Sequence, residues 1–172
     1  LNTLSLYTNI DSWSDKTESD QTITTDYANE PSSVRYYSLT NKSKNPGVNV
    51  GSDYIKHFKN NKEREFSLRF LGEFGKNDAE LNSFQDNPGT DRYLLNTSYA
   101  VNNQYTIQAD NSIPLKKNGK LEGGLKAILR RASSDYQSLV KYNESDVYEP
   151  NKANTDYFDY NQDVISLYSM YS

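Results

Sequence analysis

Apolar and polar residues alternate with a period of two along much of the chain, which is typical of strands with one apolar face. From 105 to 115 the odd positions are mostly apolar, while positions 106, 108, 110 and 112 are polar. The same alternation runs through 48–58, 66–74 and 121–129. Sustained helical spacing of apolar residues is absent from every window of about 11 residues or more. The sequence therefore predicts an all-β protein.

The alternating segments predict an antiparallel up-and-down meander of about six long strands. We expect the strands at about 1–13, 33–58, 63–76, 92–115, 120–138 and 157–172, with an irregularity near Asn45-Pro46-Gly47. Tight turns are expected near 59–62 and 116–120, where Asn118-Gly119 is a strong hairpin signal. Long polar loops are expected at about 14–32, 77–91 and 139–156. Residues 1–172 would thus form three consecutive hairpin units whose long and short connections alternate.

Two of these hairpins form an internal repeat that predicts how the strands pair. We set Leu115 opposite Leu121 in the second hairpin, and the first hairpin takes the equivalent register. Opposite charges then face each other on the polar face, which favours a register by roughly 0.2–1 kcal/mol per pair. A shift of one residue would turn the apolar face to the other side of the sheet. The predicted pairs are Asp53 with Arg69 and Asp110 with Lys126.

The predicted strands are long enough to cross a lipid bilayer. Strands in soluble sheets usually have about 5–6 residues, whereas a tilted strand needs about 9–11 to span a membrane. Alternating faces, short turns at one end, long loops at the other and abundant aromatic residues favour part of an outer-membrane β-barrel. The four charged register residues would then face the lumen. The residues expected to face the membrane are Tyr54, Phe58, Phe66, Leu68, Phe70, Phe74, Ile107, Ile113, Leu115, Leu121, Leu125 and Leu129.

Average composition conceals this pattern and leaves an alternative open. The 172 residues are only 34% hydrophobic and have a mean hydropathy of −0.92, but 13% of them are aromatic, which argues against disorder. A soluble sheet with its apolar face on a core would show the same alternation. The alternative is therefore a secreted or periplasmic β-sheet module that binds carbohydrate or protein through tyrosine-rich loops. A requirement for detergent would separate the two.

The chemistry-bearing residues do not form a recognisable catalytic or metal site. The chain has no cysteine, and His57 is its one histidine, so thiol, Ser/His/Asp and multi-histidine chemistry lack their groups. Asp86, Asn87 and Asp91 do not follow the EF-hand calcium pattern and are expected in a solvated turn. The net charge is −4 and cations are scattered, so nucleic acid is not an expected partner. We expect a non-enzymatic protein without cofactor or metal.

Several segments, in their order along the chain, resemble a known family of membrane proteins. These segments are 53–58 with 66–68, 105–110, 114–126 and 157–172, and the resemblance covers about 47–172. The chain is similar to the outer-membrane β-barrel proteins of the TonB-dependent-receptor-like kind in Gram-negative bacteria. The glycines Gly72, Gly123 and Gly124 lie in strands of this region, where we expect close backbone approach rather than phosphate binding.

The resemblance implies a role as a barrel-wall segment of a receptor or transporter that takes up a nutrient through the outer membrane. Barrels of this kind have about 22 strands and a plugged lumen, so the chain would be a fragment without plug or signal peptide. Six strands are fewer than the roughly eight of the smallest bacterial barrels, so the two edge strands should pair with further strands. The implied partners are outer-membrane lipid, the remaining strands and plug, an inner-membrane energising protein, and a surface lipoprotein or nutrient ligand.

Overall fold

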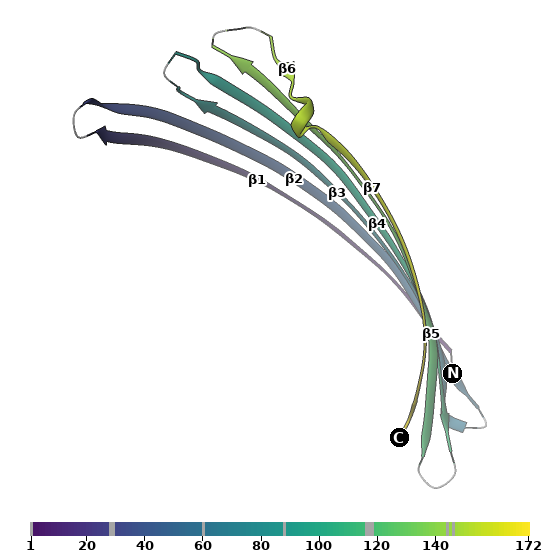
Figure 1. Cartoon of the computed structure of the whole chain (residues 1–172). Helices are drawn as coiled ribbons and strands as arrows, with labels where there is room; N and C mark the ends of the chain where they lie inside the picture. Colours follow the sequence, from purple (N-terminus) through teal and green to yellow (C-terminus); the bar gives the residue numbers. More distant parts are fainter. Residues whose placement is uncertain are drawn as a thin grey trace.

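A computed structural model describes residues 2–27, 30–59, 61–87, 89–115, 119–143, 145 and 147–172. They form one long, strongly curved sheet of a single layer (Figure 1). Both chain ends lie near the end of the sheet where the tight turns near 59–62 and 116–120 were predicted, which we call the tight-turn end. The elements are β1 (Asn2–Tyr27), β2 (Glu30–Phe58), β3 (Asn61–Gln85), β4 (Arg92–Pro114), β5 (Lys120–Tyr142), β6 (Glu149–Pro150), the 3-10 turn η1 (Lys152–Asn154) and β7 (Asp156–Tyr171).

Strand order confirms the predicted antiparallel meander. Strands β1 to β5 pair with their neighbours in sequence, and β7 and the short β6 both pair with the far edge of β5. Among the described residues, β1 and β7 therefore each have one edge without a partner strand. The sheet is not closed.

Two of the three predicted long loops are wrong. Strand β1 continues to Tyr27 and β2 begins at Glu30, so most of the predicted loop at 14–32 is paired strand. Strand β3 likewise continues to Gln85. The third loop, between β5 and β7, is confirmed in outline and contains β6 and η1. Alternation reveals only strands with one apolar face, and these extensions are largely polar on both faces.

One of the two register predictions is confirmed and the other is wrong. Asp53 lies opposite Arg69, as predicted. The prediction for Asp110 is wrong by two residues, because Asp110 lies opposite Gly124. The cause is at the turn, where the Leu115 backbone N–H donates to the Gly119 carbonyl at 2.7 Å instead of pairing with Leu121. A shift of two residues keeps every side chain on its predicted face.

The tight turns and the predicted irregularity have mixed outcomes. Lys116, Lys117 and Asn118 lie outside the described residues, as does Asn60. The first turn carries a register shift between His57 and Phe58. At 45–46, β2 stays paired with β1 but drops out of the ladder with β3, which then resumes in the same register. The irregularity is therefore a local gap in pairing.

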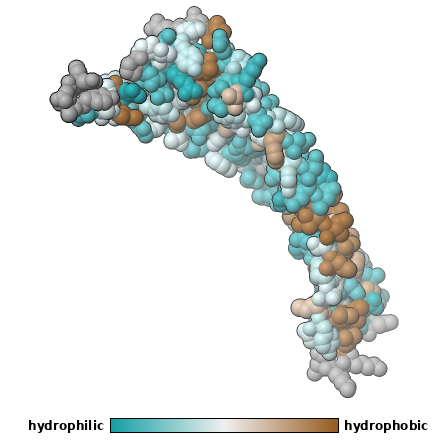
Figure 2. Space-filling view, viewed as in Figure 1, coloured by the Kyte–Doolittle hydropathy of each residue, from teal (hydrophilic) through white to brown (hydrophobic). Residues whose placement is uncertain are grey.

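The register gathers the apolar side chains on one face of the sheet, in its half nearer the tight turns. Figure 2 shows apolar residues there on the convex side. Of the twelve residues predicted to face the membrane, ten lie on this face. Phe58 lies beyond the register shift and Leu115 lies beyond the end of β4. This apolar band consists of Leu4, Leu6, Ile10, Val48, Val50, Tyr54, Phe66, Leu68, Phe70, Phe74, Tyr105, Ile107, Ala109, Ile113, Leu121, Leu125, Ala127, Leu129, Ile165, Leu167 and Tyr171.

The apolar band is uncovered. No hydrophobic residue is buried in the described part of the chain, and Leu6 and Leu167 are 76% and 83% exposed. Folded domains normally bury such a face against a second layer of structure. This sheet has none among its described residues.

The band also runs obliquely across the strands. On β1, the band residue farthest from the tight turns, its upper limit, is Ile10. Following the paired residues across the sheet from Ile10 leads to Asn161 on β7. The upper limit of the band on β7 is Ile165, which is four residues from Asn161. Strands are about 4.8 Å apart and rise about 3.3 Å per residue, so this offset corresponds to a strand tilt of roughly 30°. Strands of membrane barrels tilt by about 35–45°.

Candidate functional site

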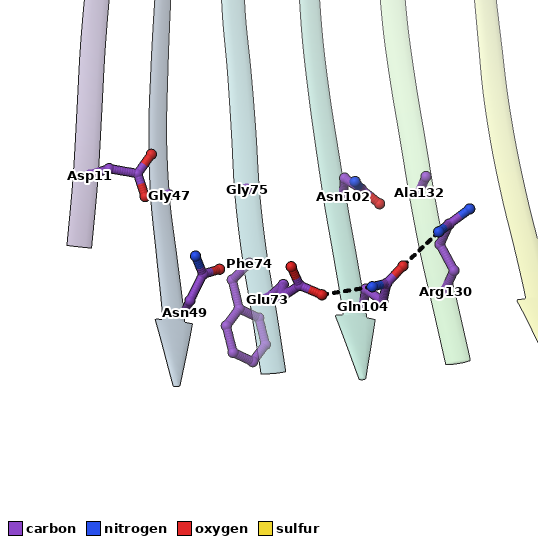
Figure 3. A pocket seen from close by; sticks show the side chains of 10 residues that line it. All are labelled: Asp11, Gly47, Asn49, Glu73, Phe74, Gly75, Asn102, Gln104, Arg130 and Ala132. Carbon is purple, nitrogen blue, oxygen red and sulfur yellow. Dashed lines mark hydrogen bonds between the residues drawn. The ribbon is translucent and has the colours of Figure 1, made fainter. Parts of the chain in front are cut away.

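The face opposite the apolar band carries a row of polar side chains that crosses four strands. Glu73, Gln104, Arg130 and Gln162 are successive partners on β3, β4, β5 and β7. Gln104 Nε2 donates to Glu73 Oε2 at 2.6 Å, and its Oε1 accepts from Arg130 Nε and Nη2 at 3.0 and 2.6 Å (Figure 3). Arg130 Nη1 also donates to Gln162 Oε1 at 3.3 Å. Gln104 thus separates the positive charge of Arg130 from the negative charge of Glu73.

A hollow of about 530 Å³ lies beside this polar row. Its floor is the next row of the ladder on the same face, which includes two glycines and an alanine (Figure 3). A Cβ added to Gly75 would meet only the Asn102 carbonyl oxygen, at 3.8 Å, so the space above Gly75 is open, whereas a Cβ at Gly47 would lie 3.0 Å from the Asp11 carboxylate oxygens. Amide, carboxylate and guanidinium groups around an open floor can hydrogen-bond a polar solute. The floor residues are Asp11, Gly47, Gly75, Asn102 and Ala132.

The four charged residues predicted to mark the register lie on this polar face, but only two of them meet. Arg69 Nε donates to Asp53 Oδ1 at 2.7 Å. Lys126 lies opposite Gln108 and Ser166 rather than Asp110. The pairing of opposite charges therefore identified one true contact and one wrong one.

Asp110 instead takes part in a hydrogen-bonded cluster with Tyr168. The Tyr168 hydroxyl donates to Asp110 Oδ1, and Gln108 Nε2 donates to Asp110 Oδ2 and to the Tyr168 hydroxyl oxygen, both at 2.9 Å. Sequence reasoning missed Tyr168 because apolar residues on β7 do not separate onto one face. The adjacent Gly124 was the available signal, since a glycine in a strand often marks close approach.

Arg131 and Asp163 form an ion pair at the upper margin of the apolar band, on the same face as the band. Arg131 Nη1 donates to Asp163 Oδ1 at 2.5 Å and Nη2 donates to Oδ2 at 3.2 Å. The hydrogen bond from Arg131 lowers the pKa of Asp163, and Asp163 in turn raises the pKa of Arg131. Both side chains are about half exposed, so the pair is a weak, screened contact.

We expect a small acid-dependent loss of stability from this pair. The native pKa of Asp163 lies below its ordinary value of 3.8, so the stabilisation is present above that value and is lost as pH falls through the native pKa. Denaturant unfolding in detergent micelles, measured from neutral pH to about pH 2.5, should show this step in the native chain. Asp163→Asn should lack it, and an identical pH profile in both proteins would contradict the role of the pair.

The described ranges contain neither a metal-binding cluster nor a membrane-spanning helix. No group of three histidine, cysteine, aspartate or glutamate side chains in those ranges is placed to hold a metal ion. His57 Nδ1 lies 3.7 Å from the Glu65 carboxylate near the first tight turn. Among the described residues, no helix is long and apolar enough to span a membrane.

Comparison with known proteins identifies the class to which this sheet belongs. The sequence model of the outer membrane protein beta-barrel family matches residues 62–172. The chain belongs to this family. It is a β-barrel protein of the outer membrane, which confirms the predicted outer-membrane β-barrel family and the predicted location. No curated protein matches the sequence.

One solved structure similar to this chain is the ferric yersiniabactin uptake receptor FyuA from Yersinia pestis. The identity is 16% and the TM-score is 0.45. The match covers 93% of this chain and 22% of the FyuA chain. The chain thus spans about a fifth of the length of that receptor.

Proposed function

We propose that this family member is a barrel-wall segment of a TonB-dependent-type receptor or transporter that takes up a nutrient and performs no catalysis. The observation that carries the proposal is a single-layer sheet with an uncovered apolar band on one face and a hydrogen-bonded polar row on the other. A lipid-facing wall around a polar lumen requires that arrangement.

The energetics of the apolar band favour a membrane over water. Shielding a large aliphatic or aromatic side chain from water stabilises a protein by roughly 1.5–3 kcal/mol. The band contains many such side chains, and the described residues provide no second layer to cover them. Lipid chains would cover all of them at once. A soluble binding module would need a core that this sheet does not supply.

In this proposal the polar face lines the lumen. The row from Glu73 to Gln162 and the adjacent hollow would contact a permeating nutrient or the plug that fills the lumen. The unpaired edges of β1 and β7 would pair with the remaining strands of the barrel wall. An inner-membrane energising protein and a surface lipoprotein complete the proposed partners.

The ends of the strands give the proposed orientation. The band ends at Phe74 on β3, and Lys76 and Asp78 follow on the same face. Strand β3 then continues to Gln85, about 35 Å beyond the band at the usual rise per residue. Short turns of bacterial barrels face the periplasm and longer segments face outward. The tight turns would therefore be periplasmic, and the extended strands would project from the cell surface.

Nutrient uptake is tested by growth of the bacterial host. Deletion of the gene should slow growth when a scarce nutrient too large for passive diffusion limits the culture, and the native gene should restore it. Arg130→Ala should restore growth less well than native while reaching the outer membrane in equal amount, because it removes the cation of the polar row. A deletion strain that grows normally across a broad panel of limiting nutrients would refute uptake. A folded, monodisperse monomer without detergent would favour the soluble module instead.

A further inference from the structure

A second hollow lies at the tight-turn end of the sheet, where the apolar band stops. It has a volume of about 360 Å³ and is lined by Asn2, Lys56, His57, Phe58 and Lys59. Lys56 lies opposite Phe66, the last residue of the band on β3, so the hollow adjoins the lower limit of the band. Both lysines are exposed.

Two cationic side chains lie over the ring of Phe58 at this hollow. Arg64 lies over the ring with its guanidinium carbon 4.3 Å from the ring centroid, and the Lys56 ammonium lies 5.1 Å from it. None of the ion pairs within the described residues includes Lys56, Lys59 or Arg64. The nearby Glu65 carboxylate faces His57. Lys56, Lys59 and Arg64 therefore have no acidic partner among these pairs, whereas Lys120 beside the second tight turn is paired with Glu122 at 2.6 Å.

Beyond the opposite margin of the band, some of the cations are paired with acids. There Arg131 is paired with Asp163 at 2.5 Å, and further out Lys42 is paired with Glu80 at 3.3 Å. The chain as a whole carries a net charge of −4, yet 56–65 holds Lys56, Lys59, Lys62 and Arg64 against Glu63 and Glu65. The segment 56–65 thus carries an excess of positive charge where the first tight turn meets the apolar band.

We propose that this hollow binds the headgroup of an anionic glycerophospholipid of the phosphatidylglycerol type in the periplasmic leaflet. The phosphate would accept charge-assisted hydrogen bonds from Lys56 and Arg64, and the glycerol backbone would pack on Phe58. The acyl chains would continue along the apolar band, directly above the hollow. Cations close to a membrane surface attract anionic lipid in this manner. The inference rests on the proposed function, because it takes the apolar band to face lipid.

Lipid titrations of the full-length native chain test the site. Native mass spectrometry of the detergent-solubilised protein should show tighter binding of phosphatidylglycerol than of phosphatidylcholine. Lys56→Gln with Arg64→Gln should weaken phosphatidylglycerol binding about 30-fold, since each juxtamembrane cation contributes roughly fivefold. Lys16→Gln with Lys42→Gln removes two cations from the other end of the sheet and should leave binding unchanged. Lys56→Arg with Arg64→Lys should keep the preference.

Each outcome decides the proposal. Equal affinity of the native chain for both lipids, or native-like binding by the double glutamine variant, would overturn it. Displacement of the lipid by soluble glycerol phosphate at comparable concentration would point to free phosphate and would also overturn it. If the glutamine variant fails to assemble, loss of the preference in the charge-conserving variant would overturn it. Failure of the proposed function is seen separately, as a native chain that does not insert into phosphatidylcholine bilayers.

Discussion

Replacing Ile107 by arginine should destabilise the membrane-inserted protein by about 2–4 kcal/mol, the cost of a cation near the bilayer centre on the lipid face of a barrel. Ile107 lies in the middle of the apolar band, between Phe70 on β3 and Ala127 on β5, and is 46% exposed. Its environment in the proposed barrel is lipid, which cannot solvate a guanidinium group. Reversible denaturant unfolding of the full-length chain in vesicles measures the change.

Ser67→Arg is the matched control, because it introduces the same side chain on the opposite face of the sheet. There it would lie opposite Asp110, beside a carboxylate, and should change stability by less than about 1 kcal/mol. Equal losses in the two variants would show that the faces are not lipid and lumen. A larger loss for Ser67→Arg would invert the assignment.

The part of the fold predicted from sequence is the part where one face of the sheet is apolar and the other is polar. On β3, from Phe66 to Phe74, every second side chain belongs to the apolar band or is a glycine, so period-two reading located the strand and its sidedness. Beyond Phe74 both faces are largely polar. The ladder continues there through backbone hydrogen bonds, which leave no pattern in the side chains, and the strand extensions were therefore predicted as loops.

The register between β4 and β5 shows a second limit. Face alternation cannot distinguish registers that differ by two residues, because both keep Asp110 on the polar face, and the pairing of opposite charges supported the wrong one. The structure selects the register in which Asp110 faces Gly124 and receives the hydroxyl of Tyr168. Tyr168 belongs to β7, which is far along the chain, so the sequence around the β4–β5 turn does not reveal this contact. The polar row through Gln104 was missed for the same reason, since it exists only once four strands are aligned.

Gly124→Ala should cost about 1–3 kcal/mol, although alanine is the smallest possible addition. A Cβ at this position would overlap the Asp110 carboxylate and would lie 2.5 Å from the Tyr168 hydroxyl oxygen. The tyrosine ring lies across the glycine and fills the space that a side chain would take. The new methyl group must therefore displace the ring and break its hydrogen bond to Asp110. Denaturant unfolding in vesicles, as for Ile107→Arg, gives the loss.

Two further variants separate this overlap from a general effect of losing glycine. Gly75→Ala places a Cβ no closer than 3.8 Å to the Asn102 carbonyl oxygen and should be nearly neutral. Tyr168→Ala combined with Gly124→Ala should cost less than the sum of the single changes by about 0.5–3 kcal/mol, because the obstructing ring is already absent. Strict additivity would mean that the ring does not cover Gly124. The cycle thus also tests the β4–β5–β7 register, because only that alignment brings Asp110, Gly124 and Tyr168 together.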